Sequence, residues 1–428
     1  MNKIITKLLS DNLLKRGYFS FVCALLSVII LPIHVKYLPP FMIMWGICWI
    51  LENYSRFNII WNSKTAYKLL FIMFVAYYLW QAVGILYSTD IKMGLLNLFG
   101  RLALILFPLV LFSPGETVQN KANILVRIFA LSTFLFILLC FGYALYRSVS
   151  LQNGLWTFNP HPAQYPWLSY FYSSELTISQ HPSYIAMYVL LSVFICFESW
   201  FDHSVKFQYR ILWLILGFLL LISMYFLSSR AGILISLILI PFYIIYKFNR
   251  LRKGKFIWIV VILIVILLIP LVLKNKRVDY LYGEVFNKQV DYQRKKDPRF
   301  LIWGSTLNIV RQNLLLGVGI GDVRTELAKE YERIGEVEMA KERLNAHNQF
   351  LEVLLENGII GSVLFISIFI CMTFIAISDK NLLYGLFIII IFAFFLFESI
   401  LYRFAGVSFF SLFSFLLLHI PKNPSESY

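Results

Sequence analysis

The chain has 428 residues, of which 59% are hydrophobic, 18% aromatic and 14% charged, and its formal net charge is +15. A soluble globular domain carries about 25% charged residues, so this composition excludes an ordinary soluble enzyme and predicts a membrane protein. The positive charge does not indicate nucleic acid, because the basic residues stand in short clusters between apolar runs, where they are a signal of topology. All five cysteines lie inside apolar runs and predict neither a disulfide framework nor a metal site.

Repeated apolar runs of about 17 to 25 residues can cross a bilayer, and each must be helical because unpaired backbone groups are costly in lipid. The sequence therefore predicts an all-α polytopic integral membrane protein with about twelve transmembrane helices. No small-residue cleavage pattern follows the first apolar run, so we interpret it as an uncleaved span. In chain order, the expected spans are residues 18–31, 40–51, 69–87, 94–112, 124–146, 182–197, 211–227, 231–246, 256–273, 350–377, 382–397 and 405–420.

Three regions follow from this pattern: transmembrane helices one to nine in residues 1–273, a large polar loop in residues 274–346, and the last three helices in residues 347–428. With a cytoplasmic N-terminus, almost every short loop with an excess of Lys and Arg falls on the cytoplasmic side, as the positive-inside rule requires. The same topology gives a cytoplasmic C-terminus and places the large loop outside, together with an aromatic-rich segment over residues 147–181. We interpret that segment as an interfacial lid or a re-entrant segment.

The large loop contains two predicted helices and one glycine-rich turn. Residues 298–311 have helical spacing, and residues 325–343 predict one strongly charged helix. No strand precedes the glycine-rich residues 317–321, so they do not indicate a dinucleotide-binding loop. They predict a turn where two backbone segments approach closely. No zinc-type ligand spacing is present, and no paired acidic motif lies outside the membrane, so we expect neither a metal nor a cofactor.

Two arginines are candidates for binding an anion. Arg230 stands in the turn of a predicted helical hairpin, where a guanidinium is costly unless it reaches water or meets an anion such as phosphate. Arg299 follows Pro298 at the expected amino end of a helix, where the macrodipole adds to its positive charge. The alternatives are an interfacial anchor for Arg230 and a solvated basic face for Arg299.

His347 lies where the large loop returns to the membrane, next to Asn345 and Asn348. A neutral imidazole accepts a proton from an alcohol or holds a hydroxyl in line for attack. A single interfacial histidine is more often structural, so the hypothesis depends on its neighbours.

Other polar residues in or beside the spans are candidates because intramembrane charge is functional by default. For Glu398 and Arg403, a structural pairing with each other is an equally good interpretation. The candidate substrate-binding residues are Arg101, His181, Tyr184, Trp303, Asn345, Asn348, Glu398 and Arg403.

Four motifs in this order resemble the signature of the O-antigen ligase and polymerase superfamily. The resemblance covers residues 228–361, whereas the first five spans resemble the family only in general hydropathy. It implies a metal-independent membrane glycosyltransferase in the bacterial inner membrane whose site faces the periplasm. The motifs are Ser229-Arg230-Ala231-Gly232, Arg299-Phe300-Leu301-Ile302-Trp303, the glycines at 317, 319 and 321, and the stretch from His347 to Gly361.

The resemblance also implies substrates and roles. The donor would be a glycan on undecaprenyl diphosphate, with Arg230 and Arg299 binding the diphosphate and His347 activating the acceptor hydroxyl. The acceptor would be a lipid A core sugar for a ligase, another repeat unit for a polymerase, or a protein hydroxyl for an O-oligosaccharyltransferase. We favour the ligase because about twelve spans carry one dominant late loop, whereas the short C-terminal tail argues against the last of these. A transporter would place polar residues near mid-membrane in both halves, and only Arg101 fits that pattern well.

Overall fold

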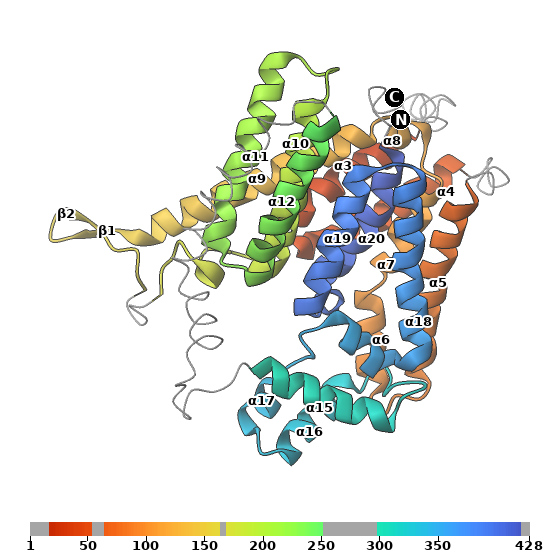
Figure 1. Ribbon diagram of the computed structural model, residues 1–428. Helices are drawn as coiled ribbons and strands as arrows, with labels where there is room; N and C mark the ends of the chain where they lie inside the picture. Colours follow the sequence, from red (N-terminus) through yellow and green to blue (C-terminus); the bar gives the residue numbers. More distant parts are fainter. Residues whose placement is uncertain (1–16, 54–63, 163–167, 251–297, 421–428) are drawn as a thin grey trace, which may run out of the picture. The chain divides into compact units, whose positions relative to one another are not determined.

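The computed structural model describes residues 17–53, 64–162, 168–250 and 298–420. Within these ranges, seven helices are long and apolar enough to cross a membrane, and three shorter apolar helices accompany them. The prediction of an all-α membrane protein is therefore confirmed (Figure 1). The predicted ninth span and residues 274–297 of the large loop lie outside the described residues, so the count of twelve spans stays a prediction.

The chain folds as two compact units, and their boundary lies inside the long helix α9 (Ala122–Ser148). The first unit combines the two ends of the chain, Met1–Phe129 and Lys296–Tyr428. The second unit is the middle of the chain, Ala130–Lys295.

The first unit contains most of the predicted spans, and their observed bounds agree with the predicted ones within a few residues. Aromatic side chains fill its core, where the rings of Phe365 and Phe369 lie 5.5 Å apart and Phe410 stacks on Phe369 at 5.9 Å. The helices are α3 (Tyr18–Ile33), α4 (Leu38–Asn53), α5 (Thr65–Ile85), α6 (Ile91–Gly100), α7 (Ala103–Phe112), α8 (Glu116–Asn120), α18 (Gln349–Ser378), α19 (Leu382–Phe397) and α20 (Phe404–Leu416), with the 3₁₀ turns η1 (Val35–Tyr37), η4 (Ile400–Tyr402) and η5 (Leu417–His419).

Two spans that the sequence predicts as continuous are broken. The predicted fourth span forms α6 and α7, which are separated at Arg101 and Leu102. In α18 the break is at Gly358, whose φ of 61° and ψ of −164° are not helical. A Cβ at Gly358 would lie 2.2 Å from the carbonyl oxygen of Leu315, so only glycine fits this approach.

The segment that fills the break in α18 is residues 314–321, which we call the glycine loop. Its backbone amides at Val318 and Gly319 donate to the carbonyls of Leu355 and Glu356, at 2.8 and 3.0 Å. Gly319 has a φ of 89°, a conformation that strains any residue with a Cβ. The predicted close approach of two backbone segments is confirmed.

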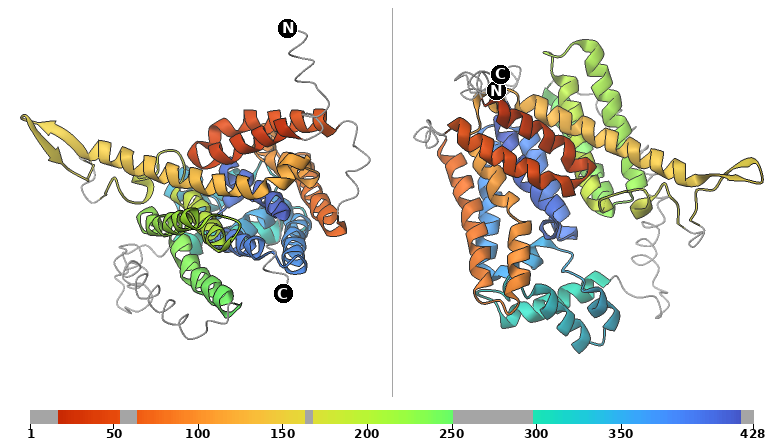
Figure 2. Two further views of the ribbon diagram at one scale, coloured as in Figure 1. Left: turned by 90° about the horizontal axis from the view of Figure 1, so that it is seen from above. Right: turned by 180° about the vertical axis from the view of Figure 1, so that it is seen from behind.

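The helices of the large loop share a small apolar core with Leu355 of the membrane helix α18 and gather at one end of the first unit (Figures 1 and 2). The helix predicted over residues 298–311 is confirmed. The single charged helix predicted over residues 325–343 is wrong, because Gly335, with a φ of 85°, divides it into two. The three helices are α15 (Pro298–Gln312), α16 (Val323–Arg333) and α17 (Val337–Glu342).

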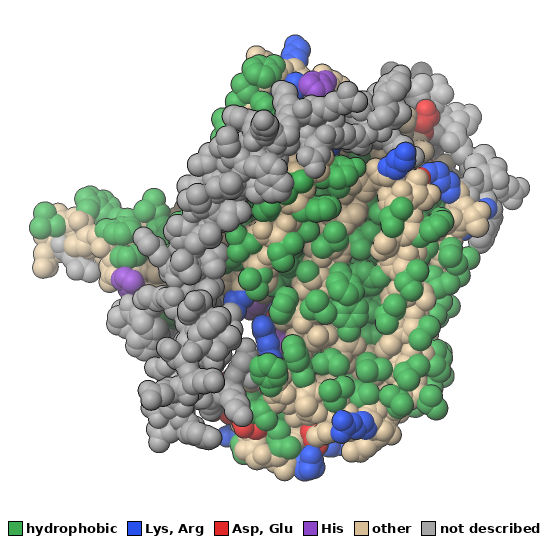
Figure 3. Space-filling view, in the orientation of Figure 1, with side chains coloured by type: hydrophobic (Ala, Val, Ile, Leu, Met, Phe, Trp, Pro, Cys, Tyr) green, Lys and Arg blue, Asp and Glu red, His purple; other side chains and the backbone are tan. Residues whose placement is uncertain are grey.

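The outer face of α18 is apolar. Ile366, Ile370, Phe374 and Ile377 follow one another at spacings of three or four residues and are 48%, 65%, 62% and 72% exposed. Figure 3 shows hydrophobic side chains over this face and charged side chains at its two ends. A continuous exposed apolar stripe of this kind is typical of a helix that faces lipid.

Among its described residues, the second unit holds most of α9, three further long helices and a β-hairpin that the all-α prediction did not include. The two strands pair antiparallel from Val149 opposite Phe158 to Gln152 opposite Leu155. They replace part of the predicted lid or re-entrant segment. The described elements beyond α9 are β1 (Val149–Gln152), β2 (Leu155–Phe158), η3 (Ser173–Glu175), α10 (Pro182–Phe201), α11 (Phe207–Leu227) and α12 (Arg230–Arg250).

Candidate functional site

His347 pairs with a carboxylate at the start of α18. Its Nδ1 lies 3.0 Å from Oε1 of Glu398, which follows the last residue of α19. The two side chains are 30% and 16% exposed, so they are held by the protein but remain accessible. Glu398 therefore pairs with His347, and its alternative pairing with Arg403 stays a prediction.

Two asparagines fix the backbone around His347. Asn348 is the N-cap of α18: its Oδ1 accepts the N–H of Phe350 at 2.9 Å, and its Nδ2 donates to the carbonyl of Leu396 at 3.1 Å. The Oδ1 of Asn345 accepts the N–H of His347 at 3.1 Å. These bonds hold His347 at a φ of 46°, a left-handed conformation that needs local support. A role of either asparagine in binding substrate stays a prediction.

Helix α15 connects Arg299 to the same region. Trp303 donates its Nε1–H to the carbonyl of Ala346, the residue before His347, at 3.1 Å. Arg299 precedes Trp303 by one helical turn and therefore lies on the same face of α15. Pro298 is the first residue of that helix, as the sequence predicts, so Arg299 stands at its positive amino end.

Arg101 is buried and paired. It is 7% exposed, and its two terminal nitrogens donate to the two carboxylate oxygens of Glu356, with Nη2 to Oε2 at 2.9 Å. Its Nη1 also donates to Oε1 of Gln81 at 3.2 Å. The pair joins the break between α6 and α7 to the residue just before the bend of α18. Arg101 therefore has a structural role, and its predicted role in substrate binding is not tested.

One face of α18 carries three buried polar side chains, Gln349, Glu352 and Glu356, at spacings of three and four residues. Oε2 of Glu352 accepts the N–H of Ala346 at 2.9 Å and the hydroxyl of Ser399 at 3.2 Å. Glu352 thus links the residues beside His347 to those beside its partner. The sequence analysis overlooked both glutamates, although two carboxylates four residues apart in an apolar span are the signal that would have found them.

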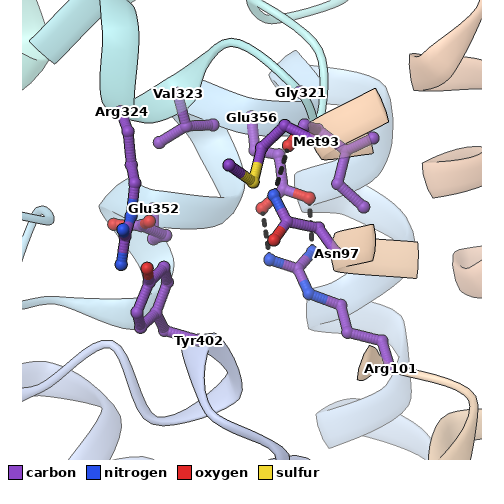
Figure 4. A pocket seen from close by; sticks show the side chains of 10 residues that line it. Met93, Asn97, Arg101, Gly321, Val323, Arg324, Glu352, Glu356 and Tyr402 are labelled. Carbon is purple, nitrogen blue, oxygen red and sulfur yellow. Dashed lines mark hydrogen bonds and ion pairs between the residues drawn. The ribbon is translucent and has the colours of Figure 1, made fainter. Parts of the chain in front are cut away.

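Arg403 is exposed and directly precedes α20. Its neighbour Tyr402 ends η4, and the ring of Tyr402 lies under the guanidinium of Arg324, 4.5 Å away. Arg324 is a second residue that the sequence analysis did not single out. Figure 4 shows Arg324 and Tyr402 with Glu352 in one pocket beside the Arg101 pair.

In the second unit, the remaining candidates lie at one end of a helical bundle. Arg230 is the first residue of α12, after a turn in which Ser228 has a φ of 52°, so the predicted hairpin is confirmed. His181 is the N-cap of α10, and its ring lies 6.5 Å from that of Tyr184.

The amino ends of α10 and α12 lie at the same end of this bundle. A Cβ at Gly232 would lie 3.1 Å from the Cβ of Ala186, so the first turns of the two helices touch. Two positive helix ends therefore accompany Arg230, which suits an anion. Whether Arg230 meets His347 stays a prediction, because they belong to different units.

In the described ranges, no group of three or more His, Cys, Asp or Glu side chains is placed to hold a metal ion. The fold defines a helical membrane protein, and the pair of His347 and Glu398 lies at the end of a candidate span. Residues 215–366 match the family model described as O-Antigen ligase. This match confirms the resemblance to the O-antigen ligase and polymerase superfamily, and it includes Arg230, Arg299 and His347. A comparison with curated proteins finds no match.

Proposed function

We propose that the protein is an O-antigen ligase that transfers a glycan from undecaprenyl diphosphate to a hydroxyl of a lipid A core sugar. The observation that carries this proposal is the contact of His347 with Glu398 within the unit that also holds Arg299. The family match supports a glycosyltransferase that joins a lipid-linked glycan to an acceptor.

In this reaction the acceptor hydroxyl oxygen attacks the anomeric carbon of the donor. The new glycosidic C–O bond forms while the bond from that carbon to the diphosphate oxygen breaks. The proton of the hydroxyl passes to His347, and undecaprenyl diphosphate leaves with the bonding electron pair. A positioned histidine base contributes about a hundredfold to ten-thousandfold in rate.

Glu398 orients the base. A carboxylate accepts a hydrogen bond from the Nδ1–H of a neutral imidazole, so the lone pair of Nε2 is the one that receives the proton. The same carboxylate stabilises the imidazolium that forms in the transition state. Because Asn345 and Asn348 hold the backbone on either side, the ring is positioned before substrate arrives.

The arginines stabilise the leaving group. Arg299 at the amino end of α15 and Arg230 at the amino end of α12 each combine a guanidinium with a positive helix end. Preorganised donors of this kind typically lower a barrier by about 2.7 to 4 kcal/mol each. The proposal assigns to these arginines the charge stabilisation that a metal provides in other enzymes.

The proposed orientation places both termini in the cytoplasm and the site at the periplasmic face of the inner membrane. It is supported by the clusters of Lys and Arg in the short loops between spans. A polymerase that adds the glycan to another repeat unit fits the family match equally well, and so does a protein O-oligosaccharyltransferase. The test must therefore identify the acceptor.

The test is the electrophoretic profile of lipopolysaccharide from cells that lack this protein and are complemented with variants. For a ligase, the deletion removes every polymer-bearing band, undecaprenyl-linked polymer accumulates, and the native chain restores the ladder while His347→Ala does not. His203→Ala is the matched control, because His203 is an exposed histidine bonded to Arg210 in the turn between α10 and α11. A core with a single repeat unit would identify a polymerase instead, and an unchanged profile would refute both.

A further inference from the structure

A small pocket lies beside the Arg101 pair in the first unit and is lined by α6, the glycine loop, α16, α18 and η4 (Figure 4). It has room for about one water molecule. A cavity of that size cannot enclose a sugar, but it can take one oxygen atom of a substituent.

Arg324 is the cation of this pocket that has no carboxylate bound to it among the described residues. It is the second residue of α16, and its guanidinium carbon lies over the ring of Tyr402, 4.5 Å from the ring centroid. Its Nε is buried and has no hydrogen-bond partner in the described part of the chain. Arg101 in the same pocket provides the contrast, because both of its terminal nitrogens bind Glu356.

The surroundings of Arg324 are positively charged. Burial, followed by repulsion from Arg343 and Arg403, lowers the pKa of Arg324, while the carboxylate of Glu352 opposes that shift. Of the two carboxylates that line the pocket, Glu356 is bonded to Arg101, and Glu352 is bonded to Ser399 and to a backbone amide. An excess of positive charge around a buried, unsatisfied donor is the arrangement that an anion relieves.

The pocket shares two of its walls with the His347 pair. Glu352 accepts the N–H of Ala346, which directly precedes His347. Tyr402 lies four residues after Glu398, on the 3₁₀ turn that follows it. A group bound at Arg324 would therefore belong to a substrate that also reaches His347.

We propose that Arg324, stacked on Tyr402, binds a phosphate or carboxylate group carried by the saccharide substrate and thereby selects anionic substrates. This inference rests on the proposed function for the identity of the substrate, but not for the binding itself. The Nε–H and one terminal N–H of an arginine form a fork that matches two oxygens of one anion. The group could be the donor diphosphate or an acidic substituent of a sugar, and the two are separable by experiment.

The test measures binding of three ligands to the purified full chain in detergent by isothermal titration calorimetry: inorganic pyrophosphate, glucose 1-phosphate and glucuronate. Arg324→Gln is expected to weaken binding of at least one of them by about tenfold or more, because charge-assisted hydrogen bonds are lost. Arg333→Gln is the matched control, since Arg333 is on the same helix, 64% exposed and paired with Glu330. Tyr402→Leu keeps the charge but removes the stacking partner, and a smaller loss in the same direction is expected.

Each outcome distinguishes the source of the anion. Loss of pyrophosphate binding alone would assign Arg324 to the donor diphosphate, and loss of glucuronate binding alone would assign it to an acidic sugar. Equal affinities in the native chain and Arg324→Gln, or an equal loss in Arg324→Gln and Arg333→Gln, would refute the site. Thermal unfolding of each variant, together with Arg324→Lys, which retains the charge, separates a binding defect from misfolding.

Different experimental results would refute the anion site at Arg324 and the proposed ligase function. Ligand binding that depends on Arg324 in a protein whose deletion leaves lipopolysaccharide unchanged would refute the ligase proposal and leave the anion site standing. The opposite result, a ligase whose ligand affinities do not depend on Arg324, would refute only the anion site.

Discussion

The buried pair of Arg101 and Glu356 gives a prediction whose magnitude follows from its geometry. The side chains are 9% and 1% exposed, and two parallel hydrogen bonds join them. Glu356→Gln keeps the size of the side chain but leaves the guanidinium charge buried without its partner. Such a loss typically costs about 3 to 5 kcal/mol, which lowers the folded-to-unfolded ratio by roughly a hundredfold to a few thousandfold.

The assay is thermal unfolding of the purified full chain in detergent, with the single variants Glu356→Gln and Arg101→Met and the double variant Arg101→Met/Glu356→Gln. We expect each single variant to be strongly destabilised and the double variant to recover a large part of the loss, because it buries no unpaired charge. The exposed pair of Lys64 and Asp379 is the control. Lys64 Nζ lies 2.6 Å from Asp379 Oδ1, and the Lys64 side chain is 58% exposed. Because exposed ion pairs contribute little to stability, Lys64→Gln should cost no more than about 1 kcal/mol. Additive losses in the double variant would refute the coupling.

Three further predictions concern the large loop and its helices. Gly319→Ala should destabilise the protein by about 1 to 3 kcal/mol, because a Cβ there lies 2.3 Å from Ser88 Oγ. Gly304 is a helical site whose Cβ would meet nothing within 4 Å, so Gly304→Ala should stabilise the protein by about 0.5 to 1 kcal/mol. Thermal unfolding measures both changes, and changes of the same sign would contradict the argument. Trp303→Phe removes the donor to the segment before α18 and should cost about 1 kcal/mol in the same assay. The hydrogen bonds from Arg333 lower the pKa of Glu330, so their contribution is present above the ordinary carboxyl pKa and is lost as pH falls through the lowered value. Melting curves of the native chain and Arg333→Gln should therefore converge at acid pH, and a gap that does not change with pH would contradict this.

The spans were predictable because a long apolar run admits only a helix in lipid. The bounds of α19 were predicted without error, since the polar residues Asn381 and Glu398 flank its apolar sequence on both sides. The two breaks were not predicted, because each depends on a partner far along the chain. Arg101 is 255 residues from Glu356 along the chain, and the hydropathy of a short window cannot predict that contact.

The candidate site shows the same limit. His347 could be identified from its position between the polar loop and an apolar span. Its partner is 51 residues away, and the sequence left open whether Glu398 binds Arg403 or substrate. The sequence could not distinguish Arg324 from the other arginines of a charged helix. What distinguishes Arg324 is its contact with the ring of Tyr402, a residue on a turn that lies far along the chain.

The glycines of the large loop and the polar face of α18 depend on each other. The carbonyls of Leu355 and Glu356 accept amides of the glycine loop. The amide of Ile359, which a continuous helix would direct to the carbonyl of Leu355, donates to the carbonyl of Leu314 instead. The bend that results ends the segment of α18 that carries Glu352 toward His347 and Glu356 toward Arg101. A motif of glycines that has no chemistry of its own thus sets where the charged side chains of α18 lie. This explains why a glycine-rich turn accompanies the arginine and histidine motifs in the same chain, and why its loss is expected to disturb the site from a distance.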